Sequence, residues 1–296
     1  MYNLLGADAE IPFRKYESIY PYIVQIGTGG TGGYIVQHLA QMLGTLDCPH
    51  SYVLVDPDTI ESKNLKNQLF LEEEIGEKKA EVLADRYAAA YNLNISTFTE
   101  KYVESVSEII SLFASEYLST GDGYFNYKVK LVPILIGSVD NAFTRQQLHK
   151  AFLELPRCIY IDSGNESVKV PRDWQNRPIN EWSNEELKDY KESGWTGQIV
   201  CGIKDGTQII QPPICEVYPD MLSTADTIKP SEVSCSDLTA SDPQRLIVNK
   251  MAAHAVMMYM SEILEDNYIE NHITVFHAKK GYMRTQDYVP YEQEQG

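Results

Sequence analysis

Residues 27–32, with the sequence GTGGTG, carry the spacing G-x-G-x-x-G between an apolar run and a segment with helical periodicity. Glycines permit a tight turn and a close approach of the backbone to a ligand. The start of a helix offers free N–H groups and a positive dipole end to phosphate oxygens. The segment therefore predicts a phosphate-binding loop and not a plain tight turn, with the candidate residues Gly27, Gly29, Gly30 and Gly32.

Asp56 directly follows a second apolar run, residues 52–55. An acidic residue at the end of the second strand of a nucleotide-binding fold typically accepts hydrogen bonds from ribose hydroxyls. Both NAD and ATP contain this sugar next to phosphates. The glycine-rich loop and Asp56 alone therefore leave two classes of protein open, an ATP-binding protein and a NAD-dependent oxidoreductase.

The segment that begins at Asp56, DPDTIESKNLKNQLFLEEEIGEKKAE, is more distinctive. It resembles the ThiF/MoeB (ubiquitin-activating-enzyme-like) superfamily, whose members carry D-x-D, N-L-x-R-Q and G-x-x-K after the glycine-rich loop. Downstream, LIGSVDNAFTRQQL resembles the family's strand-ending T-D-N, which is followed by a helix with an early arginine. The resemblance covers residues 20–160 well and the C-terminal part loosely. The matching positions are Asp56, Asp58, Asn64, Leu65, Gln68, Gly76, Lys79, Asp140, Asn141 and Arg145.

The resemblance implies an adenylyltransferase that uses ATP and Mg²⁺ to activate the C-terminal carboxylate of a small ubiquitin-like protein. Two anions must meet in such a reaction, so a cation at the phosphates and a metal held by a carboxylate are needed. By resemblance, Lys79 contacts the phosphates, Asp140 holds Mg²⁺ and Asp56 holds the ribose. The residues expected to arrange the nucleotide are Asp58, Asn64, Gln68 and Asn141. A NAD-dependent oxidoreductase would leave most of these residues unexplained.

One position departs from the family pattern. The arginine of N-L-x-R-Q is Asn67 here, and a neutral amide cannot make the charge-assisted fork of a guanidinium. Lys63, Lys66 or the partner subunit's Arg14 could compensate in a homodimer, which the resemblance also implies. The change keeps a second function open, an ATP-binding interaction module without transfer activity. Arg145 likewise has two interpretations, a site residue or an ordinary surface arginine.

The five cysteines form no CxxC pair. Cys235 lies in a loop before the late helix, where the resemblance implies a thioester-forming cysteine; the alternative is a structural or incidental thiol. Cys215 lies where relatives carry a zinc-binding pair, but Tyr218 takes the second position, so we expect no zinc. Cys201 is expected to be a small buried residue. The missing zinc pairs, the serine-flanked Cys235 and the run GQIVCG resemble the ThiF-like members of bacterial PRTRC cassettes.

Composition narrows the class of protein further. The chain has 296 residues, 43% of them hydrophobic, and a formal net charge of −17. These values favour a folded protein and disfavour a nucleic-acid partner, because a strongly acidic surface repels phosphate backbones. We find neither a signal peptide nor an apolar run long enough to span a bilayer. A cytoplasmic protein without membrane contact is therefore expected.

Alternating strands and helices must position the candidate residues. The pattern predicts an α/β, Rossmann-like, mostly parallel sheet flanked by helices, with a C-terminal antiparallel extension. Pro133 counts against a central position for its strand. The predicted strands span 22–26, 52–55, 95–98, 131–136, 159–161 and 198–203, and a terminal hairpin joins 273–276 to 282–285. The predicted helices follow the glycine-rich loop and span 78–91, 106–117, 141–155 and 244–264.

We expect one ThiF-like adenylylation domain over residues 1–296. Its nucleotide-binding core spans 20–163, an insertion, a strand and a crossover loop span 164–240, and the late helix and hairpin span 241–296. Residues 164–196 carry all three tryptophans and are expected to pack over one edge of the sheet. Ser241, Asp242 and Pro243 are expected to start the late helix, since a capping side chain precedes a proline.

Overall fold

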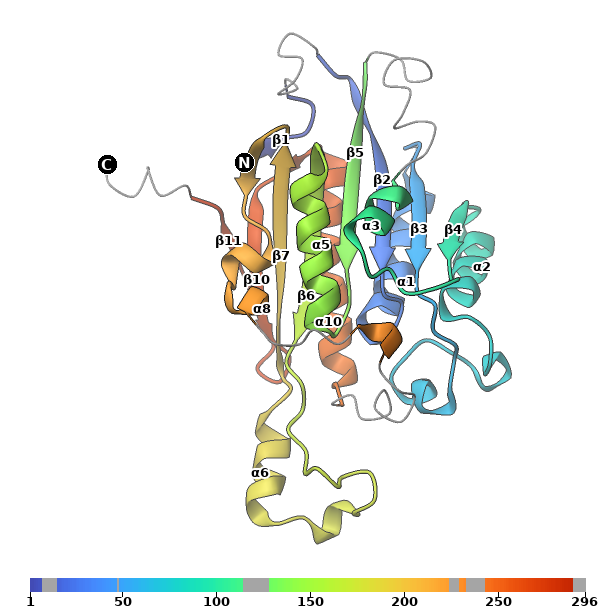
Figure 1. Cartoon of the computed structure of the whole chain (residues 1–296), viewed down its shortest axis with the longest axis vertical. Coiled ribbons are helices and arrows are strands. Elements are labelled where there is room, and N and C mark those ends of the chain that lie inside the picture. The colour runs from blue at the N-terminus through green and yellow to red at the C-terminus, as the bar shows by residue number, and fades with distance from the viewer. Residues whose placement is uncertain (7–14, 47, 114–127, 224–228, 233–242, 290–296) are drawn as a thin grey trace.

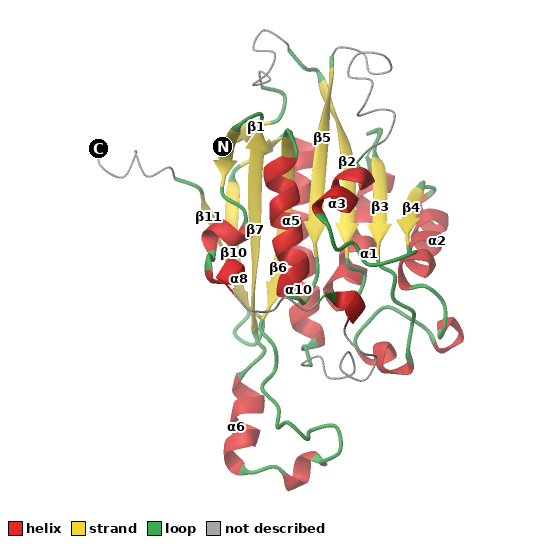
Figure 2. Ribbon diagram, viewed as in Figure 1, coloured by secondary structure: helices red, strands yellow, loops and turns green. Residues whose placement is uncertain are grey.

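The computed structural model describes residues 1–6, 15–46, 48–113, 128–223, 229–232 and 243–289. Its centre is a nine-stranded sheet with the order β11-β10-β7-β6-β5-β2-β3-β4, and β8 pairs with β7 (Figures 1 and 2). This arrangement confirms the predicted α/β class, with a mostly parallel sheet flanked by helices.

Five neighbouring strands form the parallel part of the sheet, so their carboxyl ends lie at one edge. Ligands of open α/β sheets bind at that edge. The parallel strands are β2 (Ser18–Ile26), β3 (Ser51–Val55), β4 (Ile95–Phe98), β5 (Val129–Gly137) and β6 (Arg157–Asn165). The helices between them are α1 (Gly30–Thr45), α2 (Lys79–Tyr91), α3 (Val106–Leu112) and α5 (Ala142–Glu154), with the short turns η1 (Ser62–Lys66) and η2 (Glu72–Glu74) before α2.

Helices cover both faces of the sheet and bury a separate apolar cluster on each. On one face, α1 packs between α2 and the late helix α10 (Leu246–Ser261), and the sheet's apolar side chains complete the cluster. On the other face, α5 packs against α3, α7 (Ile214–Val217) and α8 (Asp220–Ser223). Both clusters bury strand residues, which explains why the parallel strands read as nearly continuous apolar runs.

The C-terminal part forms the predicted antiparallel extension. Strand β7 pairs antiparallel with β6, and the hairpin formed by the next two long strands adds to β7. The bounds are β7 (Thr196–Asp205), β8 (Gln208–Gln211), β10 (Asn271–His277) and β11 (Tyr282–Asp287). Elsewhere, β1 (Tyr2–Asn3) pairs with β9 (Tyr268–Ile269), a π-helical turn η5 (Glu262–Asp266) follows α10, and η4 spans Pro230–Glu232.

Strand β5 lies in the centre of the sheet, so the inference drawn from Pro133 was wrong. Pro133 pairs with Tyr22 of β2, and the pairing of β5 with β6 begins only at Ile134. The proline therefore stands just before the strand gains its second partner, where a missing N–H costs no bond to β6.

Residues 166–195 do not lie over an edge of the sheet, contrary to expectation. They project beyond the carboxyl end of β6 and contain η3 (Ile179–Glu181) and α6 (Asn184–Glu192) (Figure 1). This insertion contacts the start of α10, where Val168 donates its N–H to the carbonyl of Pro243 at 2.9 Å. Arg245 has an extended backbone, with φ −80° and ψ 130°, so α10 begins at Leu246 and not at Gln244. The predicted capping residues Ser241 and Asp242 lie outside the described residues.

Candidate nucleotide-binding site

The glycine-rich loop joins the end of β2 to the start of α1, as predicted. Gly27 has a φ of +96°, and a Cβ there would lie 2.5 Å from the carbonyl oxygen of Ser138. A Cβ on Gly32 would lie 2.1 Å from the carbonyl oxygen of Gly27. The first-turn N–H groups of α1 have no acceptor within the helix, and no side chain caps this end. Together these features make an anion-binding helix end.

The buried side chain of Gln25, in β2, holds this loop and was missed in the sequence analysis. Gln25 Nε2 donates to the carbonyl oxygens of Gly27 and Gly32, at 3.0 and 2.9 Å. The hydroxyl of Tyr52 donates to Gln25 Oε1 at 2.6 Å, and both side chains are buried. The available signal was a glutamine inside the apolar run YIVQI, because a buried amide needs partners.

Asp56 turns its carboxylate towards the same loop. Thr28 donates to Oδ2 from its backbone N–H and from its hydroxyl, each at 2.8 Å. The N–H of Asp58 donates to Oδ1 at 3.0 Å. Burial raises the pKa of Asp56, although the ammonium of Lys79 opposes the shift. A carboxylate offers about four lone-pair sites, so Oδ1 retains room for one further donor.

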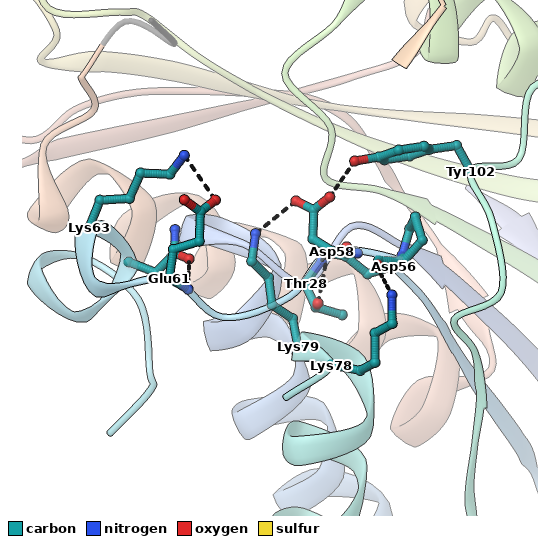
Figure 3. Close-up of polar contacts among 10 residues, drawn as sticks. Thr28, Asp56, Asp58, Glu61, Lys63, Lys78, Lys79 and Tyr102 are labelled. Atoms are coloured by element: carbon teal, nitrogen blue, oxygen red, sulfur yellow. Dashed lines mark hydrogen bonds and ion pairs between the residues drawn. The ribbon is translucent and has the colours of Figure 1, made fainter. Parts of the chain in front are cut away.

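Lys79, Asp58 and Tyr102 form a polar chain at the ends of β3 and β4 (Figure 3). Lys79 Nζ lies 2.8 Å from Asp58 Oδ2, and the hydroxyl of Tyr102 donates to Asp58 Oδ1. Only 8% of the Lys79 side chain is exposed, against 38% for Asp58. Burial alone would lower the pKa of Lys79, but the carboxylates of Asp56 and Asp58 outweigh it and raise that pKa. A permanently charged ammonium is thus held near the glycine-rich loop.

The segment between Asp58 and Lys79 brings one further predicted residue to the loop. Gln68 lies against Gly29, and its buried Oε1 accepts no hydrogen bond from any described residue. Asn64 instead shapes the turn, since its Oδ1 accepts the N–H of Glu61 at 2.8 Å. Gly76 has a φ of +96°, which suits the turn before α2.

One cation expected to compensate for the missing family arginine, Lys63, lies beside the polar chain of Lys79, Asp58 and Tyr102 (Figure 3). Asn67 ends η1 as its C-cap residue. The ammonium of Lys63 lies 3.0 Å from a carboxylate oxygen of Glu61 and is largely exposed. Arg14 lies outside the described residues.

Asp140 follows β5 at the same edge of the sheet. Its carboxylate is exposed and makes no hydrogen bond or ion pair with a described residue. Asn141 is the N-cap of α5, because its Oδ1 accepts the N–H of Thr144 at 2.7 Å.

Arg145 is not a surface arginine, so that interpretation was wrong. It pairs with Asp162 at 3.1 Å and donates to the carbonyl oxygens of Val139 and Ser163, at 2.7 and 3.0 Å. These bonds fix the backbone next to Asp140.

The late helix reaches the other flank of the glycine-rich loop, which was not predicted. A Cβ on Gly30 would lie 2.4 Å from Asn249 Nδ2. Asn249 Oδ1 accepts from Asn165 Nδ2 at 3.0 Å and from Thr31 Oγ1 at 3.3 Å. These contacts join the start of α1 to α10 and to the end of β6.

The cysteines divide into described and undescribed positions. Cys201 is buried in β7, which confirms its prediction. Cys215 is buried at the start of α7, and burial raises the pKa of its thiol to about 11. Cys235 lies outside the described residues. Within the described ranges, no three His, Cys, Asp or Glu side chains are grouped to bind a metal ion, and no helix is both long and apolar enough to cross a bilayer.

Comparison with solved structures shows a shared fold. The chain is similar to E. coli MccB crystallised with ATP, with 14% identity, a TM-score of 0.53, and coverage of 90% of this chain and 63% of that one. It is similar to the microcin C7 biosynthetic enzyme MccB in complex with N-formylated MccA, with 15% identity, a TM-score of 0.55, and coverage of 90% of this chain and 64% of that one. It is also similar to PaaA, with 14% identity, a TM-score of 0.53, and coverage of 90% of this chain and 64% of that one. The chain thus spans less than two thirds of each structure.

No curated protein matches the chain. The ThiF family matches residues 17–165, which is half of the sequence and contains the glycine-rich loop, Lys79 and Asp140. The chain belongs to the ThiF family.

Proposed function

We propose that the chain is an adenylyltransferase that activates the C-terminal carboxylate of a small peptide or protein with ATP. One observation carries the proposal: the glycine-rich loop, the charged Lys79 and the unpaired Asp140 converge at the carboxyl edge of the parallel strands. These groups match the needs of a reaction between two anions, which are positioned phosphates, a nearby cation and a carboxylate for a metal.

The chain's own residues have distinct tasks in this reaction. The first-turn N–H groups of α1 bind phosphate oxygens, and Lys79 neutralises their charge. Asp56 offers the open side of Oδ1 to a ribose hydroxyl, while Asp58, Asn64, Gln68 and Asn141 arrange the nucleotide. The substrate carboxylate oxygen bonds to the α-phosphorus, and the bond to the bridging oxygen of pyrophosphate breaks. Bound Mg²⁺, for which Asp140 is the fitting ligand, would supply further neutralisation of phosphate charge.

The finer proposal is that the substrate is a small ubiquitin-like protein, as in PRTRC cassettes, and that the enzyme is a cytoplasmic homodimer. Solved MccB complexes contain ATP in one case and MccA in another, which supports a small partner for an enzyme with this fold. Cys235 would accept the acyl group from the adenylate as a thioester and release AMP.

An ATP-binding interaction module without transfer activity is the second candidate. It is favoured by Asn67 in place of the family arginine and by the engagement of Lys63 with Glu61. A module of this kind would bind Mg-ATP with no turnover.

Pyrophosphate exchange distinguishes the two functions. The protein is incubated with Mg-ATP, labelled pyrophosphate and a small protein with a ubiquitin-like C-terminus, and the adenylate is sought by mass spectrometry. Exchange that Asp140→Asn abolishes supports the enzyme. Mg-ATP binding without exchange supports the module.

Thermal unfolding with Mg-ATP, NAD and NADP tests the nucleotide itself. A ligand at about 100 times its Kd stabilises the folded state by about 2.7 kcal/mol. A shift with NAD alone would contradict both functions and favour an oxidoreductase.

A further inference from the structure

Tyr102 lies on the segment after β4 and carries a hydroxyl into the candidate site. This hydroxyl donates to Asp58 Oδ1, while Asp58 Oδ2 lies 2.8 Å from the ammonium of Lys79 (Figure 3). The Asp58 carboxylate is therefore held from two sides, by an ammonium and by a phenol. Figure 3 shows the two partners approaching it from different elements.

The two partners of Asp58 differ in how they respond to a nucleotide. The proposed function requires the Lys79 ammonium to face phosphate oxygens, so phosphates and Asp58 compete for it. The backbone bond from Lys79 N to Asp58 O, at 3.0 Å, fixes the main chain but not the carboxylate. The phenol of Tyr102 is the side-chain partner that the phosphates do not displace.

The surroundings of Tyr102 keep its hydroxyl protonated, so that it can donate a hydrogen bond. Burial raises its pKa, and the bond to Asp58 and the nearby carboxylates of Asp56 and Asp140 raise it further. The hydroxyl is therefore protonated at neutral pH, and a protonated phenol bonded to a carboxylate is a strong, charge-assisted contact.

We propose that Tyr102 is a positioning residue that holds Asp58 in place while Lys79 turns to the phosphates of a nucleotide. With Asp58 held, its free oxygen accepts a hydrogen bond from a nucleoside hydroxyl. Tyr102 therefore makes the site select a nucleoside triphosphate over a bare polyphosphate chain. This inference rests on the proposed binding of ATP.

The test compares two ligands that share the phosphates and differ in the nucleoside. Calorimetry measures the Kd of Mg-ATP and of Mg-tripolyphosphate for the parent, for Tyr102→Phe and for Tyr20→Phe. Tyr20 is a matched control, because it is also half-buried and its hydroxyl contacts Ser51 near the amino end of the sheet. We expect Tyr102→Phe to weaken Mg-ATP about tenfold, and tripolyphosphate by less than about twofold.

A double-mutant cycle with Asp58→Asn makes the test specific. If Tyr102 acts through Asp58, Tyr102→Phe has little further effect on Mg-ATP in the Asp58→Asn background. Equal Mg-ATP affinity for the parent and Tyr102→Phe overturns the inference. So do parallel losses for both ligands, which indicate a structural role, and additive effects in the cycle. A parent that binds tripolyphosphate but not Mg-ATP refutes the proposed function itself.

Discussion

Two regions at the same edge of the sheet are built by different means. The glycine-rich loop is fixed by short hydrogen bonds from several elements, including Gln25, Asp56 and Ser138. The insertion of residues 166–195 is held mostly by contacts within itself, among them the ion pair of Arg177 with Glu186. Several residues of the sheet and its connections hold the loop, whereas the insertion is stabilised mainly by contacts between its own residues.

The junction between the two regions is small. Arg245, the N-cap of α10, lies 3.9 Å from the centre of the Trp195 ring and donates to the carbonyl oxygen of Ser193 at 3.1 Å. The same helix reaches the glycine-rich loop through Asn249. Because different residues of α10 contact the two regions, we expect that loss of the Arg245 contacts leaves the geometry of the phosphate-binding loop unchanged.

Replacing Lys79 is the change expected to affect the candidate nucleotide-binding site most severely. Lys79→Met removes the cation proposed for the phosphates and leaves the neighbouring carboxylates of Asp56 and Asp58 without their ammonium partner. We expect pyrophosphate exchange to fall by about two to three orders of magnitude. Lys280→Met, in the exposed turn between β10 and β11, should retain the parent rate. An Lys79→Met rate within about threefold of the parent would contradict the proposed role.

Gln25→Leu removes hydrogen bonds that hold the glycine-rich loop and leaves the proposed ligand contacts of the loop in place. The change removes one donor from each of the carbonyl oxygens of Gly27 and Gly32 and leaves the buried hydroxyl of Tyr52 without its acceptor. We expect a loss of about 2–4 kcal/mol in the free energy of unfolding, measured with urea, and a weaker Mg-ATP thermal shift. Tyr52→Phe, which removes one bond, should cost less. Unchanged stability in Gln25→Leu would show that the loop does not depend on this support.

Much of the candidate nucleotide-binding site was predictable, because the sequence patterns that indicate it are local. The glycines mark a turn whose φ and close contacts only glycine permits, and Lys79 has a fixed distance from them in the family pattern. Cys201 and the parallel strands were readable from continuous apolar runs. The main strands and helices are found near their predicted positions, and only some of their ends differ.

The remaining features depend on the topology, which places residues far apart in the chain side by side. Gln25 meets Tyr52, and Tyr102 meets Asp58, only because β2, β3 and β4 are neighbours. Asn249 reaches Gly30 across more than two hundred residues. Pro133 misled because a proline's place in a sheet depends on where the second partner strand begins.

Arg245→Ala tests whether the insertion is independent of the loop. The substitution removes the cation above Trp195 and two donated hydrogen bonds to the insertion. We expect a loss of about 1–2 kcal/mol in stability, with an unchanged Kd for Mg-ATP. Calorimetry and urea unfolding on the same variant check both parts. A weakened Mg-ATP affinity would contradict the separation of the two regions.

The smallest expected effect is acid sensitivity confined to the insertion. The hydrogen bond from Arg177, followed by that from the Ser183 N–H, lowers the pKa of Glu186 from 4.5 to about 2. A lowered carboxylate pKa means that the unfolded insertion binds the proton more readily than the folded one. The contribution of Glu186 is therefore complete above about pH 4.5 and is lost as the pH falls towards 2.

Tryptophan fluorescence isolates this effect, because all three tryptophans lie in the insertion. We expect the parent's emission to change between pH 4.5 and 2, and Glu186→Gln to remove the part of that change due to this carboxylate. Glu185→Gln is the matched control. Glu185 is the exposed neighbour of Glu186, and its replacement should leave the fluorescence profile unaltered. Identical profiles for the parent and Glu186→Gln would mean that the Arg177 pair does not stabilise the insertion. The insertion would then depend on the α10 junction, and the contrast between a self-supported insertion and a loop held by the sheet would fail.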